Sequence, residues 1–240
     1  MERRFNMATH DYHVRQYETM YETTRGLLEL ADECVGDMGD RLNADVACGA
    51  GANVAHMLRR WPNSKMVGYD LCKTDLDYAK GHVPSECEGR VEYKEADFFR
   101  LTEEVEAGTY ACTTLMQTLL LFNPDTYPEV LRNVIHISSE WVFLTSLFAD
   151  HNMDVTMQIR DHVRGDDVFY NIHDIPRFEA NCKALGVKEV VIRDFNISID
   201  LQAPPDGGVG TWTEKTEDGR RLQFSGAVPM PWKFCALRLK

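Results

Sequence analysis

The chain lacks several features that mark whole classes of protein. Its seven cysteines are an odd number and none forms a C-x-x-C pair, so the usual zinc and thioredoxin-like motifs are absent. No run approaches the ~20 apolar residues of a membrane span, and no internal repeat occurs. Basic residues are scarce: 26 Lys and Arg stand against 38 Asp and Glu, which gives a net charge of -12. Because a phosphate backbone would be repelled on average, the sequence disfavours a nucleic-acid binder.

What remains is an ordinary globular composition, with 240 residues, 44% hydrophobic and 27% charged. We predict a single domain over residues 1–240 in the cytoplasm, with reduced and mostly buried thiols. The expected partner is a small molecule, with neither a membrane nor a nucleic acid as a second partner. A homodimer is compatible with the sequence.

Strand and helix patterns alternate along most of the chain, which predicts an α/β fold with a mostly parallel sheet between two helical layers. The apolar run from Trp141 to Phe148 is typical of a strand buried on both faces. The other strands are expected at 42–47, 65–69, 90–93, 110–115, 187–201 and 232–239.

Three segments fall outside this alternation. Residues 8–34 have near-helical apolar spacing, and we expect residues 1–38 to form a helical lid. Residues 149–174 and 202–231 are longer than ordinary connections, and the second has the pattern of a hairpin with an Asp-Gly turn at Asp218-Gly219. Since ligands bind beyond the carboxyl ends of parallel strands, both insertions should form a small cap over the ligand.

A glycine-rich loop, Ala47-Cys48-Gly49-Ala50-Gly51, joins the first predicted strand to a helix that Asn53 should cap. Glycines allow close backbone approach to a ligand, and a helix N-terminus offers free N–H groups. Asp70 ends the next strand and can accept both hydroxyls of a ribose. A dinucleotide-binding fold predicts the same features, but Val54 occupies the place of its third glycine.

Three segments in order resemble the motifs of the Rossmann-like, class I S-adenosylmethionine-dependent methyltransferases. They are Asp45 to Gly51, Gly68-Tyr69-Asp70 and Ala96-Asp97-Phe98. The resemblance implies a seven-stranded sheet whose last strand is antiparallel, and S-adenosylmethionine as cofactor. It places Gly49 and Gly51 beneath the methionine moiety, Asp70 on the ribose and Asp97 on the adenine amino group. The full set of cofactor-binding residues that we predict is Tyr17, Asp45, Ala47, Gly49, Gly51, Asn53, Asp70, Leu71, Asp97, Phe98, Gln117 and Thr118.

The insertions and the leading helix supply candidates for the methyl acceptor's site. His151, directly after the fifth strand, is our first choice of general base, and His173 is the second. The histidines match no tight metal-ligand spacing, so we predict no metal. Substrate contacts are predicted at Tyr21, Arg160, Tyr170, Asn171 and Trp212.

We therefore expect methyl transfer to an oxygen or nitrogen of a small polar metabolite, such as a sugar or a natural-product intermediate. Two alternatives stay open. One is an NAD(P)-dependent oxidoreductase, and the other is a non-catalytic regulatory protein that binds the cofactor, because fold alone does not fix function.

Overall fold

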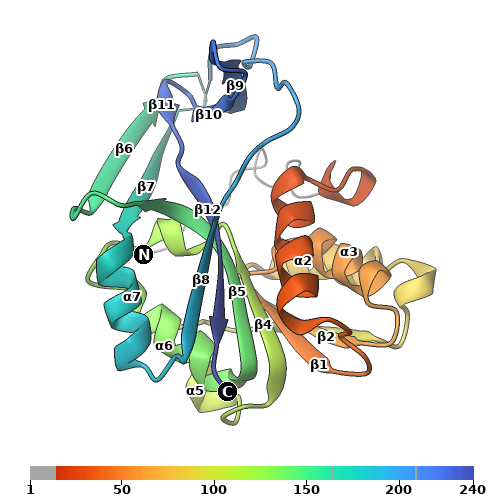
Figure 1. The fold of residues 1–240 in the computed structure, drawn as a ribbon. Coiled ribbons are helices and arrows are strands. Elements are labelled where there is room, and N and C mark those ends of the chain that lie inside the picture. Colours follow the sequence, from red (N-terminus) through yellow and green to blue (C-terminus); the bar gives the residue numbers. More distant parts are fainter. Residues whose placement is uncertain (1–14, 164, 209) are drawn as a thin grey trace.

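A computed structural model describes residues 15–163, 165–208 and 210–240. Its main sheet runs in the order β3-β2-β1-β4-β5-β12-β8, with β12 antiparallel between β5 and β8 (Figure 1). The α/β prediction, with an antiparallel last strand, is confirmed. The bounds of these strands are β1 Leu42–Val46, β2 Lys65–Asp70, β3 Val91–Glu95, β4 Tyr110–Met116, β5 Ser138–Ala149, β8 Glu189–Asp194 and β12 Trp232–Arg238.

Two layers of helices cover the sheet, as predicted. One apolar cluster combines the sheet with α5, α6 and α7, and a second combines its other face with α2, α3 and α4. Figure 1 shows these two groups on opposite sides of the strands. The helices are α2 Glu22–Val35, α3 Ala52–Arg60, α4 Lys73–Gly81, α5 Leu101–Glu104, α6 Tyr127–Ile137 and α7 Ile175–Ala184, with short 3-10 turns η1 Ser85–Cys87 and η2 Leu119–Leu121.

Strand β5 shows why the sheet is so thoroughly buried. Seven consecutive residues, 142–148, are buried, because helices cover both faces of this central strand. Its partner β12 aligns Trp232 with Leu147 and Arg238 with Trp141.

The first insertion is a β-hairpin, although no strand was expected there. β6 (Val155–Asp161) pairs with β7 (Asp166–Asp174), and β7 also pairs in parallel with the end of β5. Apolar residues alternate at Val155, Met157 and Ile159, which is the pattern of a strand. No Asn-Gly or Asp-Gly pair, however, marks the turn of a hairpin there. The chain reverses instead near Gly165, whose φ is 74° and whose N–H donates to the Asp161 carbonyl.

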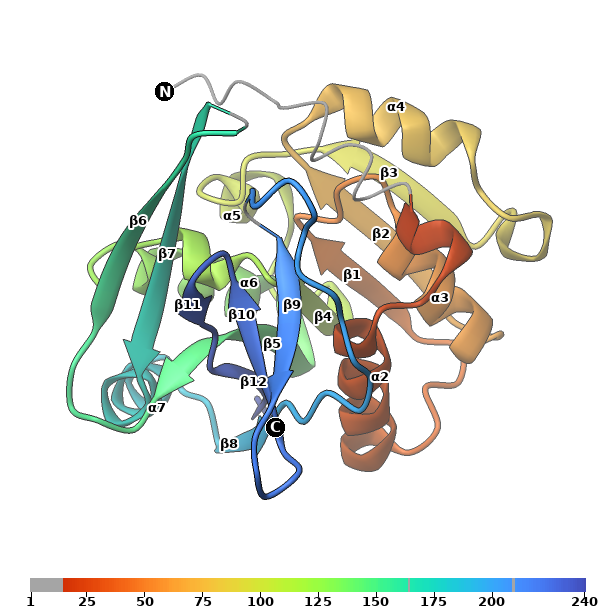
Figure 2. The ribbon, with the colours of Figure 1, turned by 90° about the horizontal axis from the view of Figure 1, so that it is seen from above.

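The second insertion contains the predicted hairpin and one strand more. β9 (Thr211–Lys215) and β10 (Arg221–Ser225) flank a turn in which Gly219 has a φ of 84°. A two-residue strand, β11 (Val228–Pro229), extends this small sheet, and it is too short to recognise from the sequence. Seen from above, the β6–β7 hairpin stands beside the β9–β11 sheet (Figure 2).

The leading helix is not continuous, which corrects our prediction for the part that is described. A helical turn over 15–18 ends, and α2 begins anew at Glu22 after an extended Tyr21 with ψ 150°. Residues 8–14 of the predicted helix lie outside the described residues. Tyr17 therefore lies in the first helical turn, whereas Tyr21 is the extended N-cap of α2.

Candidate active site

The loop between β1 and α3 has an unusual backbone. Ala47, Gly49 and Gly51 all have positive φ, at 61°, 53° and 85°. This conformation costs an alanine roughly 1–2 kcal/mol, whereas glycine adopts it freely. Ala47 is thus accommodated with strain, and the loop keeps its sharp turn into the α3 N-terminus.

Asp70 faces this loop from the end of β2. Its carboxylate accepts one hydrogen bond from the Gly49 N–H and one from the Cys72 N–H, both at 2.8 Å. Backbone amides therefore orient the carboxylate at the carboxyl edge of the sheet. That is where the sequence predicted a ribose-binding acid.

Gly51 is small for a reason that the sequence did not reveal. A Cβ built on Gly51 would lie 2.5 Å from the Tyr93 hydroxyl and 2.9 Å from the Ala79 Cβ. Gly68 on β2 is crowded by the same tyrosine ring, at 2.7 Å. Tyr93 thus fills the space beside both glycines, and its burial raises the pKa of its phenol far above the ordinary value. At Gly51 a side chain is therefore excluded by Tyr93 and Ala79 of the protein, and not only by a ligand.

The N-terminal segment closes on the loop through side chains. The Tyr17 hydroxyl donates to the Ala50 carbonyl at 2.5 Å, and the Thr24 hydroxyl donates to Asn53 Oδ1 at 2.6 Å. Asn53 was expected to cap α3, which is wrong: the N-cap is Gly51, with no side-chain cap, and Asn53 lies inside the helix. Sequence reasoning missed Thr24, because its partner lies 29 residues away.

Gln117 follows the last residue of β4 and also has a positive φ, 51°. Such strain costs on the order of 1–3 kcal/mol and is concentrated at functional sites. Its side-chain amide donates to the Thr23 hydroxyl on α2 at 3.0 Å. The next residue, Thr118, is buried and its hydroxyl donates to the Met116 carbonyl.

Two strained residues therefore sit at one place in the sheet. Ala47 follows β1 and Gln117 follows β4, and these strands are parallel neighbours with Asp45 opposite Thr114. The chain leaves β1 toward β2 on one side and reaches β4 on the other, so this is the topological switch point at which α/β sheets bind ligands.

Asp45 lies beneath the loop and is fully buried. One carboxylate oxygen accepts from the Thr114 hydroxyl at 2.5 Å, and the other has no partner. Burial, with the nearby Asp70 carboxylate as a further cause, raises the pKa of Asp45 from 3.8 to about 7.

The side of the site assigned to adenine offers apolar surface. Leu71 is 57% exposed directly after Asp70, so its side chain offers apolar surface that an adenine ring could cover. Asp97 is half-buried and accepts from the Phe99 N–H at 3.0 Å. Phe98 packs edge-on against Phe122, with ring centroids 5.3 Å apart. The N-terminus of α3, the Asp70 carboxylate and the apolar surface of Leu71 together fit an adenosyl cofactor.

The two candidate bases differ in exposure. His151 is exposed in the turn after β5. His173 is fully buried on β7, with Nε2 3.3 Å from the Leu119 carbonyl and Nδ1 without a partner. Burial lowers the pKa of His173, and aromatic rings of Tyr127 and Phe148 pack against it. A packed, neutral imidazole without access to solvent is not placed to contact an acceptor directly.

The predicted substrate residues are not all brought together. Arg160 is exposed and pairs with Asp167 at 3.1 Å on the outer face of the hairpin. Trp212 stacks on Phe224 and donates to the Gly226 carbonyl, so it holds the small sheet together. Tyr21 is half-buried before α2.

Asn171 joins the hairpin to η2. Its amide donates to the Leu120 carbonyl at 2.9 Å, and its oxygen accepts from the Thr156 hydroxyl at 2.7 Å. Since Asn171 is 2% exposed, it positions the cap rather than presenting polar atoms to a ligand.

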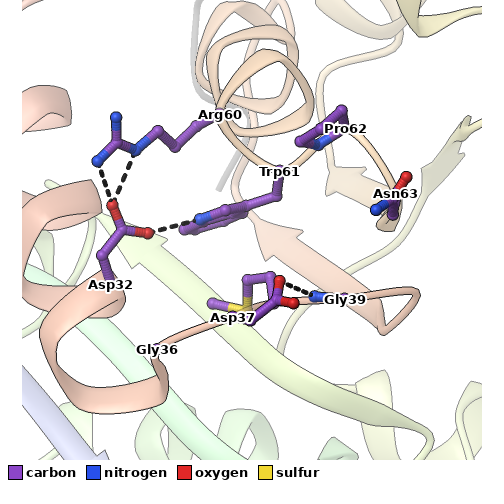
Figure 3. Close-up of a pocket in the computed structure, with 9 residues that line it drawn as sticks. Asp32, Gly36, Asp37, Gly39, Arg60, Trp61, Pro62 and Asn63 are labelled. Atoms are coloured by element: carbon purple, nitrogen blue, oxygen red, sulfur yellow. Dashed lines mark hydrogen bonds and ion pairs between the residues drawn. The ribbon is translucent and has the colours of Figure 1, made fainter.

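Two surface hollows lie away from this site. One, of about 270 Å³, is lined by the segments before β1 and β2, where Arg60 and Trp61 both bind the Asp32 carboxylate (Figure 3). The other, of about 510 Å³, is lined by the segments before β4 and β5. Both are at the amino edge of the sheet, opposite to the switch point, so neither is a candidate for the cofactor.

Across 15–163, 165–208 and 210–240, no group of three or more His, Cys, Asp or Glu side chains is arranged to hold a metal ion. Among the helices of the same ranges, none is long and apolar enough to cross a membrane.

Comparisons with known proteins agree with this geometry. Residues 44–139 match the family model described as "Methyltransferase domain". No curated protein matches the chain. A 1,6-didemethyltoxoflavin-N1-methyltransferase from Burkholderia thailandensis shares 11% identity at a TM-score of 0.60, covering 100% of this chain and 93% of its own. An S-adenosylmethionine-dependent methyltransferase from Methanosarcina mazei shares 11% identity at a TM-score of 0.59. The match covers 84% of this chain and 94% of the other.

A third neighbour shows that this fold hosts other chemistry. The [4+2]-cyclase SpnF shares 17% identity at a TM-score of 0.58, covering 72% of this chain, which spans 61% of the cyclase's own length. At such identities the likeness concerns the fold alone. Residues 44–139 therefore resemble a methyltransferase domain, and the chain has the class I, Rossmann-like fold of the S-adenosylmethionine-dependent methyltransferases.

Proposed function

We propose that the protein transfers the methyl group of S-adenosylmethionine to an oxygen or nitrogen of a small metabolite, within the sugar or natural-product classes that the sequence predicts. The observation that carries this proposal is the pair of Gly49 and Asp70. The Gly49 N–H donates to the Asp70 carboxylate at 2.8 Å, so the strained loop and the acid face each other at the switch point.

Each group at the switch point has a role in holding the donor. The loop N–H groups and the α3 N-terminus bind its amino-acid part, Asp70 accepts from the ribose hydroxyls, and Leu71 covers the adenine ring. When bound, S-adenosylmethionine supplies an electrophilic methyl group. The Tyr17 and Thr24 hydrogen bonds keep the N-terminal segment over the loop, which excludes water.

The oxidoreductase alternative is weakened by Val54. This residue is fully buried in α3 and packs in the cluster below the loop. A dinucleotide fingerprint has glycine there, so that the helix and strand can approach closely. The valine side chain supports the methyl donor over a nicotinamide cofactor.

Binding of S-adenosylhomocysteine to the purified protein tests the proposal, with NADH as the comparison ligand in calorimetry. We expect micromolar affinity for the first alone. Asp70→Ala should weaken it by roughly tenfold or more, since hydrogen bonds to a charged group are lost. Asp77→Ala, an exposed carboxylate on α4, is the matched control and should bind as the parent does. Binding of NADH instead would overturn the proposal.

His151 is our proposed general base, because it is the exposed histidine closest in sequence to the end of β5. His151→Ala should lower turnover about 10²-fold without changing affinity for S-adenosylhomocysteine. His162→Ala, at an exposed residue in the turn of the β6–β7 hairpin, serves as control. Equal turnover of the two variants would remove His151 from the mechanism. A cytoplasmic location fits the seven free cysteines and belongs to the same proposal.

A further inference from the structure

The β6–β7 hairpin has two chemically different faces. One face carries six half-buried apolar side chains, which we call the apolar strip: Val155, Met157, Ile159, Val168, Tyr170 and Ile172. Cross-strand pairs such as Met157 opposite Tyr170 place them side by side. Towards its turn the opposite face is exposed and mostly polar, with Arg160 paired to Asp167, whereas towards the body of the protein it is buried at Asn171 and His173. Arg160, which was predicted from the sequence to contact a polar acceptor, therefore points away from the strip.

The strip is joined to the end of β4. Met157, Tyr170 and Ile172 pack against a small buried cluster of Leu120, Leu147 and Met230. Leu120 belongs to η2, which begins two residues after Gln117. The apolar surface is thus continuous from the switch point along the inner face of the hairpin. Between Val155 and Ile159 it extends about 13 Å, at ~3.3 Å per residue, which is the length of two or three fused rings.

One polar atom interrupts this apolar wall. The side-chain oxygen of Gln223 on β10 is buried and has no hydrogen-bond partner. The Met230 N–H donates to the Gln223 carbonyl at 2.7 Å, which continues the β10–β11 register and puts both side chains on one face. Because Met230 belongs to the buried cluster, the side-chain amide of Gln223 lies at the border of that cluster. A buried acceptor without a donor is costly to the protein, so a ligand group is expected to pair with it.

Thr145 provides a second group of this kind. Its hydroxyl on β5 is buried without a partner, on the same face as Leu147 by strand alternation. The Thr145 carbonyl accepts from the Gln117 N–H at 3.0 Å. Two unpaired polar atoms therefore flank the cluster at which the strip meets the switch point.

We propose that the methyl acceptor is a planar aromatic or heteroaromatic molecule whose ring body lies on the apolar strip and whose hydroxyl or amino group donates to Gln223. This inference rests on the proposed function. The strip contains no charged side chain, and Tyr170 and the adjoining Trp232 are half-buried aromatic residues suited to stack on a ring. A free sugar would leave this surface uncovered and would bury hydroxyls without partners.

The test uses calorimetry on the full chain saturated with S-adenosylhomocysteine. The probes are 2-naphthol, naphthalene, which lacks the donor, and glucose. We expect 2-naphthol to bind at least tenfold more tightly than naphthalene and glucose not to bind. Gln223→Met, which keeps the side-chain length, should reduce the naphthol-to-naphthalene preference to near one while naphthalene binds as before. This ratio would not change if Gln223 only supported the sheet.

A strip variant completes the design. Ile159→Asn should weaken both naphthyl probes tenfold or more, whereas Gln158→Asn on the exposed outer face of the same strand should not. Glucose binding without 2-naphthol binding, or equal effects of the two asparagine variants, would overturn the inference. Failure of the proposed function has a different signature, since S-adenosylhomocysteine would then not bind in the first titration.

Discussion

The glycine loop and the β6–β7 hairpin lie at the same edge of the sheet but are stabilised in different ways. In the loop, strained backbone and tight packing dominate, as at Ala47 and at Gly51 against Tyr93. The hairpin is regular antiparallel structure that is half-buried on one face, and it is joined to the body through η2 and the end of β5. The loop therefore fixes one ligand closely, whereas the hairpin can vary its side chains without disturbing the sheet. Four predictions test this difference.

The largest effect is expected at Asp45, beneath the loop. Its pKa is raised to about 7, so the native state holds a proton that the unfolded chain releases near pH 4. The contribution to stability is therefore present below pH 4 and is lost as the pH rises to about 7, by roughly 4 kcal/mol. Asp45→Asn should remove this loss, measured as the difference in denaturant stability between pH 4 and 8.

The control for this pH dependence is Asp167→Asn on the hairpin. Arg160 lowers the pKa of Asp167, so this exposed carboxyl favours folding at high pH instead. A parallel pH profile for the parent and Asp45→Asn would show that Asp45 ionises normally in the native state.

Close packing of the loop predicts the next effect. Gly51→Ala should destabilise the protein by about 3 kcal/mol, since the new methyl group meets Tyr93 and the positive φ strains alanine. Gly81→Ala, at the end of α4 with no atom within 4 Å of the new Cβ, should cost nothing. Adding Tyr93→Phe should recover part of the Gly51→Ala loss, because the hydroxyl is the nearest atom. No recovery would place the strain in the backbone alone.

The hairpin predicts a smaller and more local effect. Asn171→Ala leaves the Leu120 carbonyl and the Thr156 hydroxyl without their bonds and should cost about 2 kcal/mol. Amide exchange should accelerate in β6 and β7 while the amides of β1 and β4 stay protected. Gln158→Ala, whose amide donates to exposed Asp167, should leave exchange unchanged. Uniform acceleration across the sheet would contradict a separately opening hairpin.

The smallest effect is a gain. Ala47→Gly should stabilise the chain by about 0.5–1 kcal/mol, since relief of the positive φ exceeds the entropy that glycine loses. Ala50→Gly in the same loop, where φ is not positive, should destabilise instead by a similar amount. A lower melting temperature for Ala47→Gly would show that the loop stores no strain at this residue.

Much of the fold followed from local pattern. The buried run of β5, the alternation of strands and helices, and the loop from Ala47 to Gly51 are all readable in order along the chain. The hairpin strands β6 and β7 were missed because their turn uses Gly165 without the usual dipeptide. Asn53 was misassigned because an asparagine near the start of a helix is expected to cap it, and the sequence does not reveal that this side chain accepts a hydrogen bond from distant Thr24 instead.

The sequence by itself determined the sheet, the glycine loop and the acid at Asp70, because each depends on residues close together in the chain. Only the tertiary structure decided which side chains face which way. It buried His173, turned Arg160 outward, and brought Met230 beside Leu120, more than one hundred residues earlier. The physical reason is that burial and pairing are settled between elements, where strand register and helix packing place atoms that no local pattern connects.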